Sequence, residues 1–239
     1  MAPGVSTVQP NGEANYALGI RGAVNSDFTA NQESPISIYV DEVYISQMSG
    51  AGFMLFDLER VEILRGPQGT LFGRNATGGL AHFITRKPQQ ERDAYGQFTF
   101  GEYDQVKFQG AIGGGLAENL SARFSLATHH NDGYVKNRLG DDLNNANDYA
   151  GRVQLLWEPN EQSEYLFNAR YSLQQIRTGF FENKSSRPLG PGGTGVLTPG
   201  LGNFNGYEDT DGDVFAGDYD KLGHNDLETY GFTGTFKYD

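Results

Sequence analysis

The chain has 239 residues, a formal net charge of -12 at pH 7 and no cysteine. Its acidic balance argues against nucleic-acid binding, which needs lysine and arginine to neutralise phosphates, and the lack of cysteine excludes a disulfide scaffold, a thiolate metal site and a cysteine nucleophile. Glycine, at 33 residues, is about twice its average share of ~7% and indicates a turn-rich β protein.

Short apolar segments separated by glycine fill the first part of the chain. Residues 61–64 show a short alternation that predicts a strand. Residues 65–69, with the sequence RGPQG, predict a sharp turn, because proline fixes φ and glycine permits positive φ. A second strand is expected from Leu80 to Thr85, and Lys87-Pro88 ends it. On its own, this pattern fits a hairpin in any β protein.

From Asp93 onward the sequence alternates with a period of two over longer stretches, which sorts side chains onto the two faces of a strand. Six strands are expected, each of roughly the ~9–11 residues that cross a bilayer, at about 93–101, 104–116, 120–126, 151–157, 165–174 and 230–238. One face is apolar, and the side chains predicted to point outward from it are Phe124, Leu126, Val153, Leu155, Phe167, Tyr171, Phe232 and Phe236.

Loop lengths also alternate in this second part. The loops at 117–119 and 159–162 are short, whereas those at 131–147 and 177–227 are long, so all long loops fall at one end of the strands. Aromatic residues stand near the strand ends, as they do at membrane interfaces; they are Tyr149, Trp157, Tyr165 and Tyr238. The sequence contains no run of ~18 apolar residues, so it predicts no membrane-spanning helix. The pattern favours a barrel wall over a soluble sandwich.

Residues 58–88, with the sequence LERVEILRGPQGTLFGRNATGGLAHFITRKP, resemble the distal half of the plug domain of TonB-dependent outer-membrane receptors. Three upstream motifs resemble the same family in the same order: Pro3-Gly4-Val5, Leu18-Gly19-Ile20-Arg21-Gly22 and Ile38-Tyr39-Val40-Asp41-Glu42-Val43. The chain departs from the family where Glu42 replaces the usual glycine and His82 the usual asparagine. The residues that match the plug signature are Arg21, Gly22, Asp41, Glu62, Arg65, Gly66, Pro67, Gly69, Gly73, Gly78 and Gly79.

The resemblance implies a mainly β fold with two parts. A small mixed α/β plug domain is expected over residues 1–88, and antiparallel up-and-down strands of an incomplete transmembrane β-barrel over residues 93–239. Large plugged transporters have about 22 strands, so we expect about sixteen more to follow. A signal peptide and a short energy-coupling segment are expected to precede the plug.

The same resemblance implies a receptor in the outer membrane of a Gram-negative bacterium, in contact with outer-membrane lipid. It would take up a scarce, bulky nutrient such as a ferric siderophore, with the inner-membrane energy-coupling protein TonB as its partner. No enzyme activity and no cofactor are implied. Arg123, Arg152 and Arg170, on the polar face of the strands, can hold the plug. Candidate partners for these arginines are Glu59, Glu62 and Arg65.

Two apical loops, Val24–Ser34 and Tyr44–Phe53, are expected from the resemblance to meet the ligand. They mix neutral polar and aromatic residues, which suits a small-ligand site, and we predict that Phe28, Gln47 and Phe53 contact the ligand. Neither loop contains arginine or lysine. A neutral ligand is therefore favoured, or one that is held by arginines of the barrel wall.

Other chemistry has weak support in the sequence. The acidic segment 209–213 loosely resembles a calcium loop, but Gly212 comes one position too early, so a solvated external loop is the better interpretation. The pair His129-His130 fits a polar strand end, and no HExxH spacing, nucleophile elbow or phosphate loop occurs. We therefore predict no metal site and no catalytic residue. The alternative function is a soluble β-rich carbohydrate- or protein-binding module.

Overall fold

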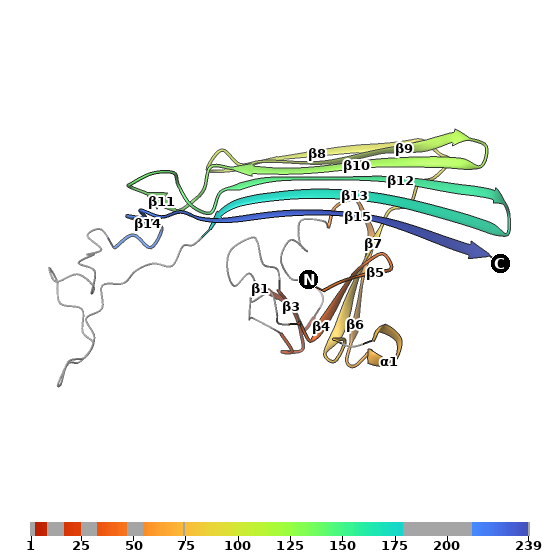
Figure 1. Cartoon of the computed structure of the whole chain (residues 1–239), viewed down its shortest axis with the longest axis horizontal. Helices are drawn as coiled ribbons and strands as arrows, with labels where there is room; N and C mark the ends of the chain where they lie inside the picture. Colours follow the sequence, from red (N-terminus) through yellow and green to blue (C-terminus); the bar gives the residue numbers. More distant parts are fainter. Residues whose placement is uncertain are drawn as a thin grey trace.

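The computed structural model describes residues 3–8, 17–24, 33–46, 55–73, 75–178 and 212–238. These residues form a small sheet that stands against one face of a long sheet (Figure 1). Strands dominate, as the sequence predicted, and α1 is the one helix in the described ranges. Within the same ranges, no helix is long and apolar enough to cross a membrane.

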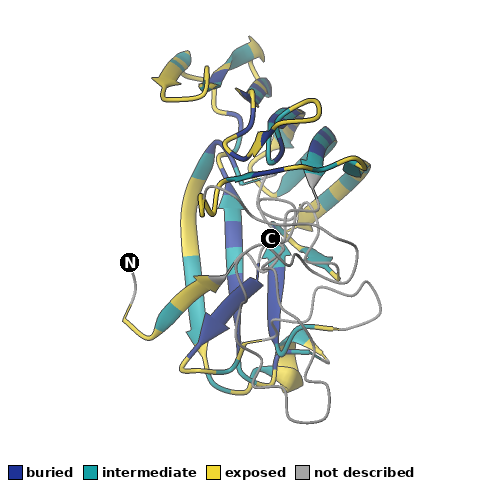
Figure 2. Cartoon of the chain, turned by 90° about the vertical axis from the view of Figure 1, so that its left-hand side faces the viewer, coloured by how far each residue is buried: buried dark blue, intermediate teal, exposed yellow. Residues whose placement is uncertain are grey.

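The small sheet is mixed, with strand order β5-β4-β7-β6. β7 lies inside it, parallel to β4 and antiparallel to β6, and most of its residues are buried, as are those of β4 (Figure 2). A buried inner strand suits the apolar sequence GLAHFIT. The elements are β4 (Ile36–Val40), β5 (Val43–Ile45), β6 (Leu58–Arg65), the single helical turn α1 (Gly69–Phe72) and β7 (Gly79–Thr85).

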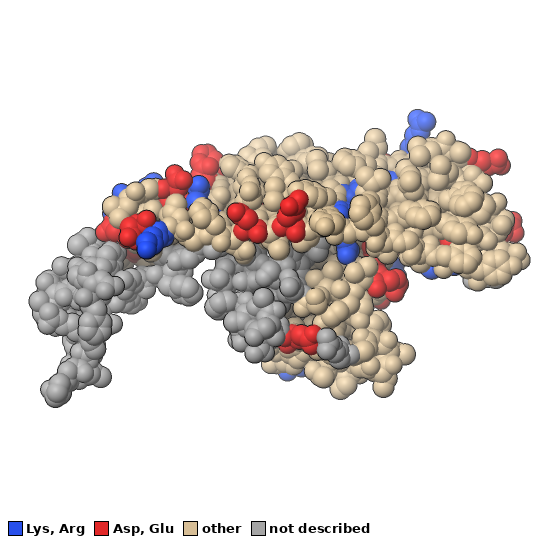
Figure 3. Space-filling model, in the orientation of Figure 1, with Lys and Arg blue, Asp and Glu red and all other residues tan. Residues whose placement is uncertain are grey.

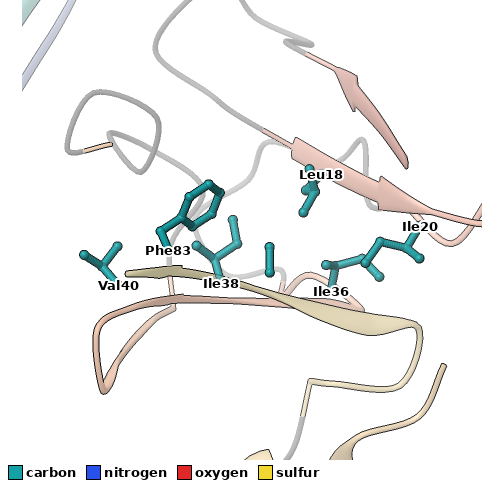
Figure 4. Close-up of a cluster of buried hydrophobic side chains, with 7 residues drawn as sticks. Leu18, Ile20, Ile36, Ile38, Val40 and Phe83 are labelled. Carbon is teal, nitrogen blue, oxygen red and sulfur yellow. The ribbon is translucent and has the colours of Figure 1, made fainter. Parts of the chain in front are cut away.

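A second, two-stranded sheet closes the core of this part. β1 (Val5–Val8) pairs antiparallel with β3 (Ala17–Ile20), and all four residues of β3 are buried. Leu18 and Ile20 of β3 point toward the apolar face of the small sheet (Figure 4). The buried cluster they form comprises Leu18, Ile20, Ile36, Ile38, Val40, Ala81 and Phe83. Packing of these aliphatic side chains, worth about 1.5–3 kcal/mol for each one fully buried, holds the small part together.

The long sheet has six antiparallel strands in the order β15-β13-β12-β10-β9-β8, which is sequential along the chain. Sequential order is the up-and-down topology that the alternation predicted. Within the described residues the sheet is not closed into a barrel. Its strands are β8 (Asp93–Phe100), β9 (Val106–Ala117), β10 (Leu120–Asn131), β12 (Ala146–Asn160), β13 (Ser163–Thr178) and β15 (Gly223–Tyr238).

The two faces of the long sheet differ as the period of two requires. The inner face, toward the small sheet, carries buried polar residues such as Arg123, Arg152 and Gln154. The outer face carries exposed apolar residues, and the eight side chains predicted to point outward lie on it. Seven of them are exposed by 38% or more, although Leu126 is half-buried. An apolar face that no other described element covers is the kind of surface that a lipid bilayer would cover.

The loops at one end of the long sheet contain regular structure that the sequence did not predict. β11 (Lys136–Asn137) pairs in parallel with β14 (Ala216–Gly217), which joins two loops that are 80 residues apart. The Asn137 side chain donates to the Tyr219 carbonyl and accepts from the Tyr219 amide, at 3.0 Å each. Charged residues gather at this end of the molecule, over β11 and β14 (Figure 3).

Candidate functional site at the junction of the two sheets

A buried carboxylate joins the small sheet to the long one. Asp57 precedes β6, and its side chain and that of Arg123 on β10 are each 1% exposed. Nε and Nη2 of Arg123 donate to the two oxygens of Asp57, both at 2.7 Å, and Ser125 Oγ donates to Oδ2 as well. Such two-point pairing is stronger and more directional than a single hydrogen bond. It fixes the start of β6 on the long sheet.

Arg152 of β12 brings a second cation to the same place. Its Nη2 donates to the carbonyl oxygens of Phe56 at 3.0 Å and Asp57 at 3.2 Å, and lies 3.5 Å from Asp57 Oδ2. The guanidinium lies 4.8 Å from the centre of the Phe56 ring. The register of β10 and β12, in which Ser125 is opposite Arg152, brings both arginines to one point on the inner face.

Arg123 also holds the first residue of the long sheet. Its Nη1 donates to both oxygens of Asp93, at 2.8 and 2.7 Å, and the Asp93 side chain is 36% exposed. Two carboxylates and two guanidiniums therefore neutralise each other, which a buried group of charges requires. We call Asp57, Asp93, Arg123, Ser125 and Arg152 the Asp57 cluster.

The environment of Asp57 favours its ionised form. Burial raises the pKa of Asp57, but the hydrogen bonds from Arg123 and Ser125 and the positive charges of Arg123 and Arg152 outweigh burial, so that the pKa lies below its usual value. The carboxylate is therefore charged at neutral pH, and the junction is an ionic one.

A second polar contact lies at the same end of the β6–β7 pair, where Thr85 is opposite Leu58. Asp41, in the β4–β5 turn, accepts hydrogen bonds from the amide of Thr85 at 2.9 Å and from its hydroxyl at 3.0 Å. Gln154 of the long sheet donates to the Thr85 hydroxyl at 3.1 Å, and Asn168 lies 3.5 Å from Asp41. The signature residue Asp41 thus organises the end of β7 and brings it against β12 and β13.

Other signature residues shape the turn between β6 and β7. The Gly66 amide donates to the Gly78 carbonyl at 3.1 Å, and Arg65 is opposite Gly79 in the register. Gly79 has φ 144, and a Cβ there would lie 2.4 Å from the Leu64 carbonyl oxygen, so this backbone crossing requires glycine. His82, which stands where the family usually has asparagine, contacts the Asp41 carbonyl through Nε2.

The buried partner of Arg123 and Arg152 is Asp57, which was not among the residues predicted from the sequence. Glu59 and Glu62 both pair with Arg60, at 2.8 Å, on the exposed side of the small sheet. Asp57 takes their place at Arg123 and Arg152. The signal that could have identified it is a single acid between two apolar residues, in the sequence Phe56-Asp57-Leu58, because an acid in such a segment becomes buried and needs a cation.

The remaining site predictions have mixed outcomes. The predicted ligand contacts Phe28, Gln47 and Phe53 lie outside the described residues, and so do residues 209–211 of the acidic segment. His129 and His130 lie on opposite faces of β10, the first buried and the second exposed, so that they cannot share a ligand. No group of three or more histidine or acidic residues in the described ranges is arranged to hold a metal ion.

Comparisons with known proteins agree with this architecture. The family described as TonB-dependent Receptor Plug Domain matches residues 1–80. The matching relatives are receptors of this class, and the long sheet corresponds to the wall of their barrels. Residues 1–80 therefore match the plug-domain family, and the chain is similar to TonB-dependent receptors over part of their length.

Individual relatives make the likeness specific. The pesticin receptor of Yersinia enterocolitica is 27% identical over 164 residues, which is 67% of this chain and 24% of that receptor. The metal-pseudopaline receptor CntO of Pseudomonas aeruginosa is 34% identical over 43% of this chain and 13% of its own length. The crystal structure of the ferric yersiniabactin uptake receptor FyuA from Yersinia pestis has a TM-score of 0.66 and 26% identity, covering 74% of this chain and 28% of that one. The chain thus spans about a quarter of the length of the pesticin receptor and a smaller share of CntO.

Proposed function

We propose that this chain provides the plug and the first six wall strands of an outer-membrane receptor that imports a scarce, bulky nutrient, such as a ferric siderophore, with energy from TonB. The proposal includes outer-membrane lipid as the environment of the long sheet and a Gram-negative outer membrane as its location. It includes no catalysis. The nutrient class is taken from the names of relatives, which include a ferrioxamine receptor and a ferric yersiniabactin uptake receptor.

The observation that carries the proposal is the two-faced long sheet with a domain held on its polar face. On β12 the outer residues run from Tyr149 to Trp157, a length of roughly 26 Å at ~3.3 Å per residue. An apolar band of about that height, bounded by aromatic residues, is typical of barrels in the outer membrane. At one end of this band the rings of Trp157 and Tyr165 are 5.0 Å apart, and those of Tyr165 and Phe236 4.7 Å.

The structure also supports a plug that stays in place without ligand. The Asp57 cluster provides a paired ionic contact between the two sheets on β10 and β12, and the Asp41–Thr85 contact adds hydrogen bonds from Gln154 of β12 and Asn168 of β13. A domain held on the polar face by such contacts would block the interior of a closed barrel. Import would then require energy to move it, which is the role that we assign to TonB.

The test is uptake by cells. The receptor, with the wall strands that close its barrel, is produced in a Gram-negative host that lacks its own siderophore receptors, and uptake of radioactive iron is measured with a panel of ferric siderophores. We expect uptake of at least one chelate, and we expect a strain without TonB to lose it. Uptake that continues without TonB would contradict the proposal. Recovery of the receptor from cytosol without detergent would instead support the alternative of a soluble binding module.

A further inference from the structure

Arg170 brings a positive charge to the inner face of the long sheet at half its height. It lies in the middle of β13 and is opposite Arg152 on β12 and Gly231 on β15. In the register of β12 and β13, this level falls between those of Tyr149 and Trp157, the two ends of the outer apolar band. Charged side chains at such a depth are costly, face the protein interior and commonly mark the route of an ion or a substrate.

The Arg170 guanidinium has no carboxylate partner in the part of the chain that the structure describes. Arg123 pairs with Asp57 and Asp93. Arg152 is directed at Asp57 as well. No ion pair and no hydrogen bond joins Arg170 to another described side chain. The expectation that three arginines of the long sheet hold the plug is therefore met by two of them, and Arg170 is left for another role.

The inner faces of β13 and β15 around Arg170 are polar and carry no acid. Apart from Arg170, glycine and aliphatic residues, the inward-facing side chains between Leu166 and Ile176 and between Leu227 and Thr235 are amides and hydroxyls: Asn168, Ser172, Gln174, Thr229, Thr233 and Thr235. The acids of β15 face outward, and Glu228 accepts a hydrogen bond from the exposed Tyr171 hydroxyl at 3.0 Å. An anion that moves along this wall from the loop end thus meets Arg170 before any acid of these two strands.

Gly231 makes room for the Arg170 side chain on β15. A Cβ at position 231 would lie 3.1 Å from Nε of Arg170 and 3.6 Å from Nη2, so the guanidinium extends over the β15 backbone. This direction leads away from Arg152 and the Asp57 cluster, which lie on the other side of β13. A guanidinium is a planar fork of donors that matches the two oxygens of a carboxylate.

The charge of Arg170 is permanent and only partly screened. A guanidinium stays protonated at every pH at which a cell grows, so its attraction for an anion needs no titration. Arg170 is half-buried, and a charge in that position is screened less than one at an exposed surface. Together with the lack of a carboxylate partner, this makes Arg170 an attractive contact for an anion inside the receptor.

We propose that Arg170 is a transit site for anionic cargo. It binds a carboxylate or another anionic oxygen group of the cargo, at half the height of the wall, while the cargo passes the small sheet along β13 and β15. Thr233 supplies a hydroxyl on the same face. This role rests on the proposed function and deepens it, because it names the sign of charge that the interior favours and the strands along which the cargo moves.

The first test measures the electrostatic potential beside Arg170. This chain has no cysteine, so Thr233→Cys introduces a thiol on the inner face of β15 without a background from the chain itself. The barrel-complete receptor is treated with an anionic reagent, sulfonatoethyl methanethiosulfonate, and with a cationic one, trimethylammonioethyl methanethiosulfonate. Each rate is divided by the rate with free cysteine. We expect the anionic reagent to be favoured by about tenfold, and no preference for it would overturn the proposal.

Variants of Arg170 in this background separate its charge from its shape. Arg170→Gln should abolish the preference, whereas Arg170→Lys should keep most of it. The control Lys136→Gln changes an exposed external lysine that pairs with Asp142, and it should leave the preference unchanged. A preference that survives Arg170→Gln would overturn the proposal. Far-UV circular dichroism and heat-modified gel mobility show whether each variant is folded, and the Thr233→Cys receptor decides the question even if an Arg170 variant is not.

The second test follows cargo through the receptor. In the uptake assay, cells receive a ferric tris-catecholate, which is an anion, and a ferric tris-hydroxamate, which is neutral. Arg170→Gln should lower the maximal uptake rate of the catecholate by about tenfold. It should leave the Kd at the cell surface unchanged, because Arg170 lies far below the external loops, and it should not slow the hydroxamate.

The two tests fail independently of the proposed function. Catecholate uptake that Arg170→Gln does not slow, or TonB-dependent import of neutral chelates alone, would refute the transit site and leave the transport function standing. An anion preference at Thr233→Cys in a receptor that imports no chelate of the panel would instead refute the transport function.

Discussion

Asp57 shows why an acid can be retained in an apolar segment. The side chains on either side of it are packed, Phe56 against Ala127 and Ala150 of the long sheet and Leu58 against the core of the small part, so the carboxylate is drawn into the interior with them. Two guanidiniums on neighbouring strands then neutralise it, and the carbonyl oxygens of Phe56 and Asp57 accept hydrogen bonds from Nη2 of Arg152. The same residue thus supplies attraction between the sheets and a fixed position for the chain before β6.

Removing this carboxylate should loosen the plug. Asp57→Ala leaves two guanidiniums buried without the carboxylate that they share, and should lower the free energy of unfolding by ~3–5 kcal/mol. Limited proteolysis of the plug in outer-membrane fragments, carried out across a series of urea concentrations, measures the change. Glu59→Ala is the control, because Glu59 pairs with Arg60 at the surface and should contribute less than about 1 kcal/mol. Similar losses in the two variants would show that the Asp57 cluster does not hold the junction.

The junction should also depend on pH with a definite sign. The pKa of Asp57 is lower in the folded protein than its usual value, because the arginine and serine hydrogen bonds outweigh burial. A lowered carboxyl pKa gives stability that is complete above the unfolded value of about 4 and is lost as pH falls through the folded value. We therefore expect protease resistance of the plug to be constant from neutral pH down to about 5 and to fall below about 4. Asp57→Asn should show a flatter decline, and an equal decline would assign the effect to other acids.

At the scale of elements, the β6–β7 pair depends on a close backbone approach. Gly79 begins β7 with φ 144, opposite Arg65 at the end of β6. Residues other than glycine rarely adopt this conformation, and the Leu64 carbonyl occupies the place of a Cβ. Gly69, at the start of α1, has open space around its Cα.

Gly79→Ala should therefore destabilise the plug by about 1–3 kcal/mol or more, because strain in φ adds to the steric conflict. Gly69→Ala should be neutral or slightly stabilising, since alanine favours the helical turn. Urea unfolding of the two variants beside the wild type measures both values. If Gly79→Ala were as stable as Gly69→Ala, the close approach of Leu64 would have no energetic importance.

The strands of the long sheet offer a matched test of their two faces. Phe232 and Thr233 are neighbours on β15, the first 83% exposed on the outer face and the second on the inner face. Phe232→Arg should cost ~2–4 kcal/mol if the position lies near the bilayer midplane, whereas Thr233→Arg should cost much less. Heat-modifiable gel mobility and outer-membrane yield report the insertion of each variant. Ser172, another inner-face residue, is 6% exposed and hydrogen-bonded to Thr229, so it is a poorer control.

At the scale of the whole molecule, the period of two in the sequence predicted the strand topology and the face on which each side chain lies. Alternation in segments such as 165–174 assigns each side chain to a face, and short turns between strands require antiparallel neighbours, so topology and facing followed together. The Asp57 cluster could not be predicted in this way, because Asp57 and Arg123 are 66 residues apart and no local pattern encodes their meeting. The parallel pairing of β11 with β14 was missed for the same reason.

The parallel pairing of β4 with β7 has a mechanical consequence. β7 is held to the long sheet near its carboxyl end, at Thr85, whereas β4 is reached from the amino-terminal side at Ile36. In a parallel pair these two ends lie at opposite ends of the ladder. Tension between them therefore loads the five residue pairs from Ile36–Gly79 to Val40–Phe83 in shear, and their hydrogen bonds must break together. The antiparallel β1–β3 pair, pulled at Val5, is instead opened from one end, one pair after another. A force applied at the amino-terminal side of β1 would therefore separate the β1–β3 pair at low load, and would then meet the stronger β4–β7 pair.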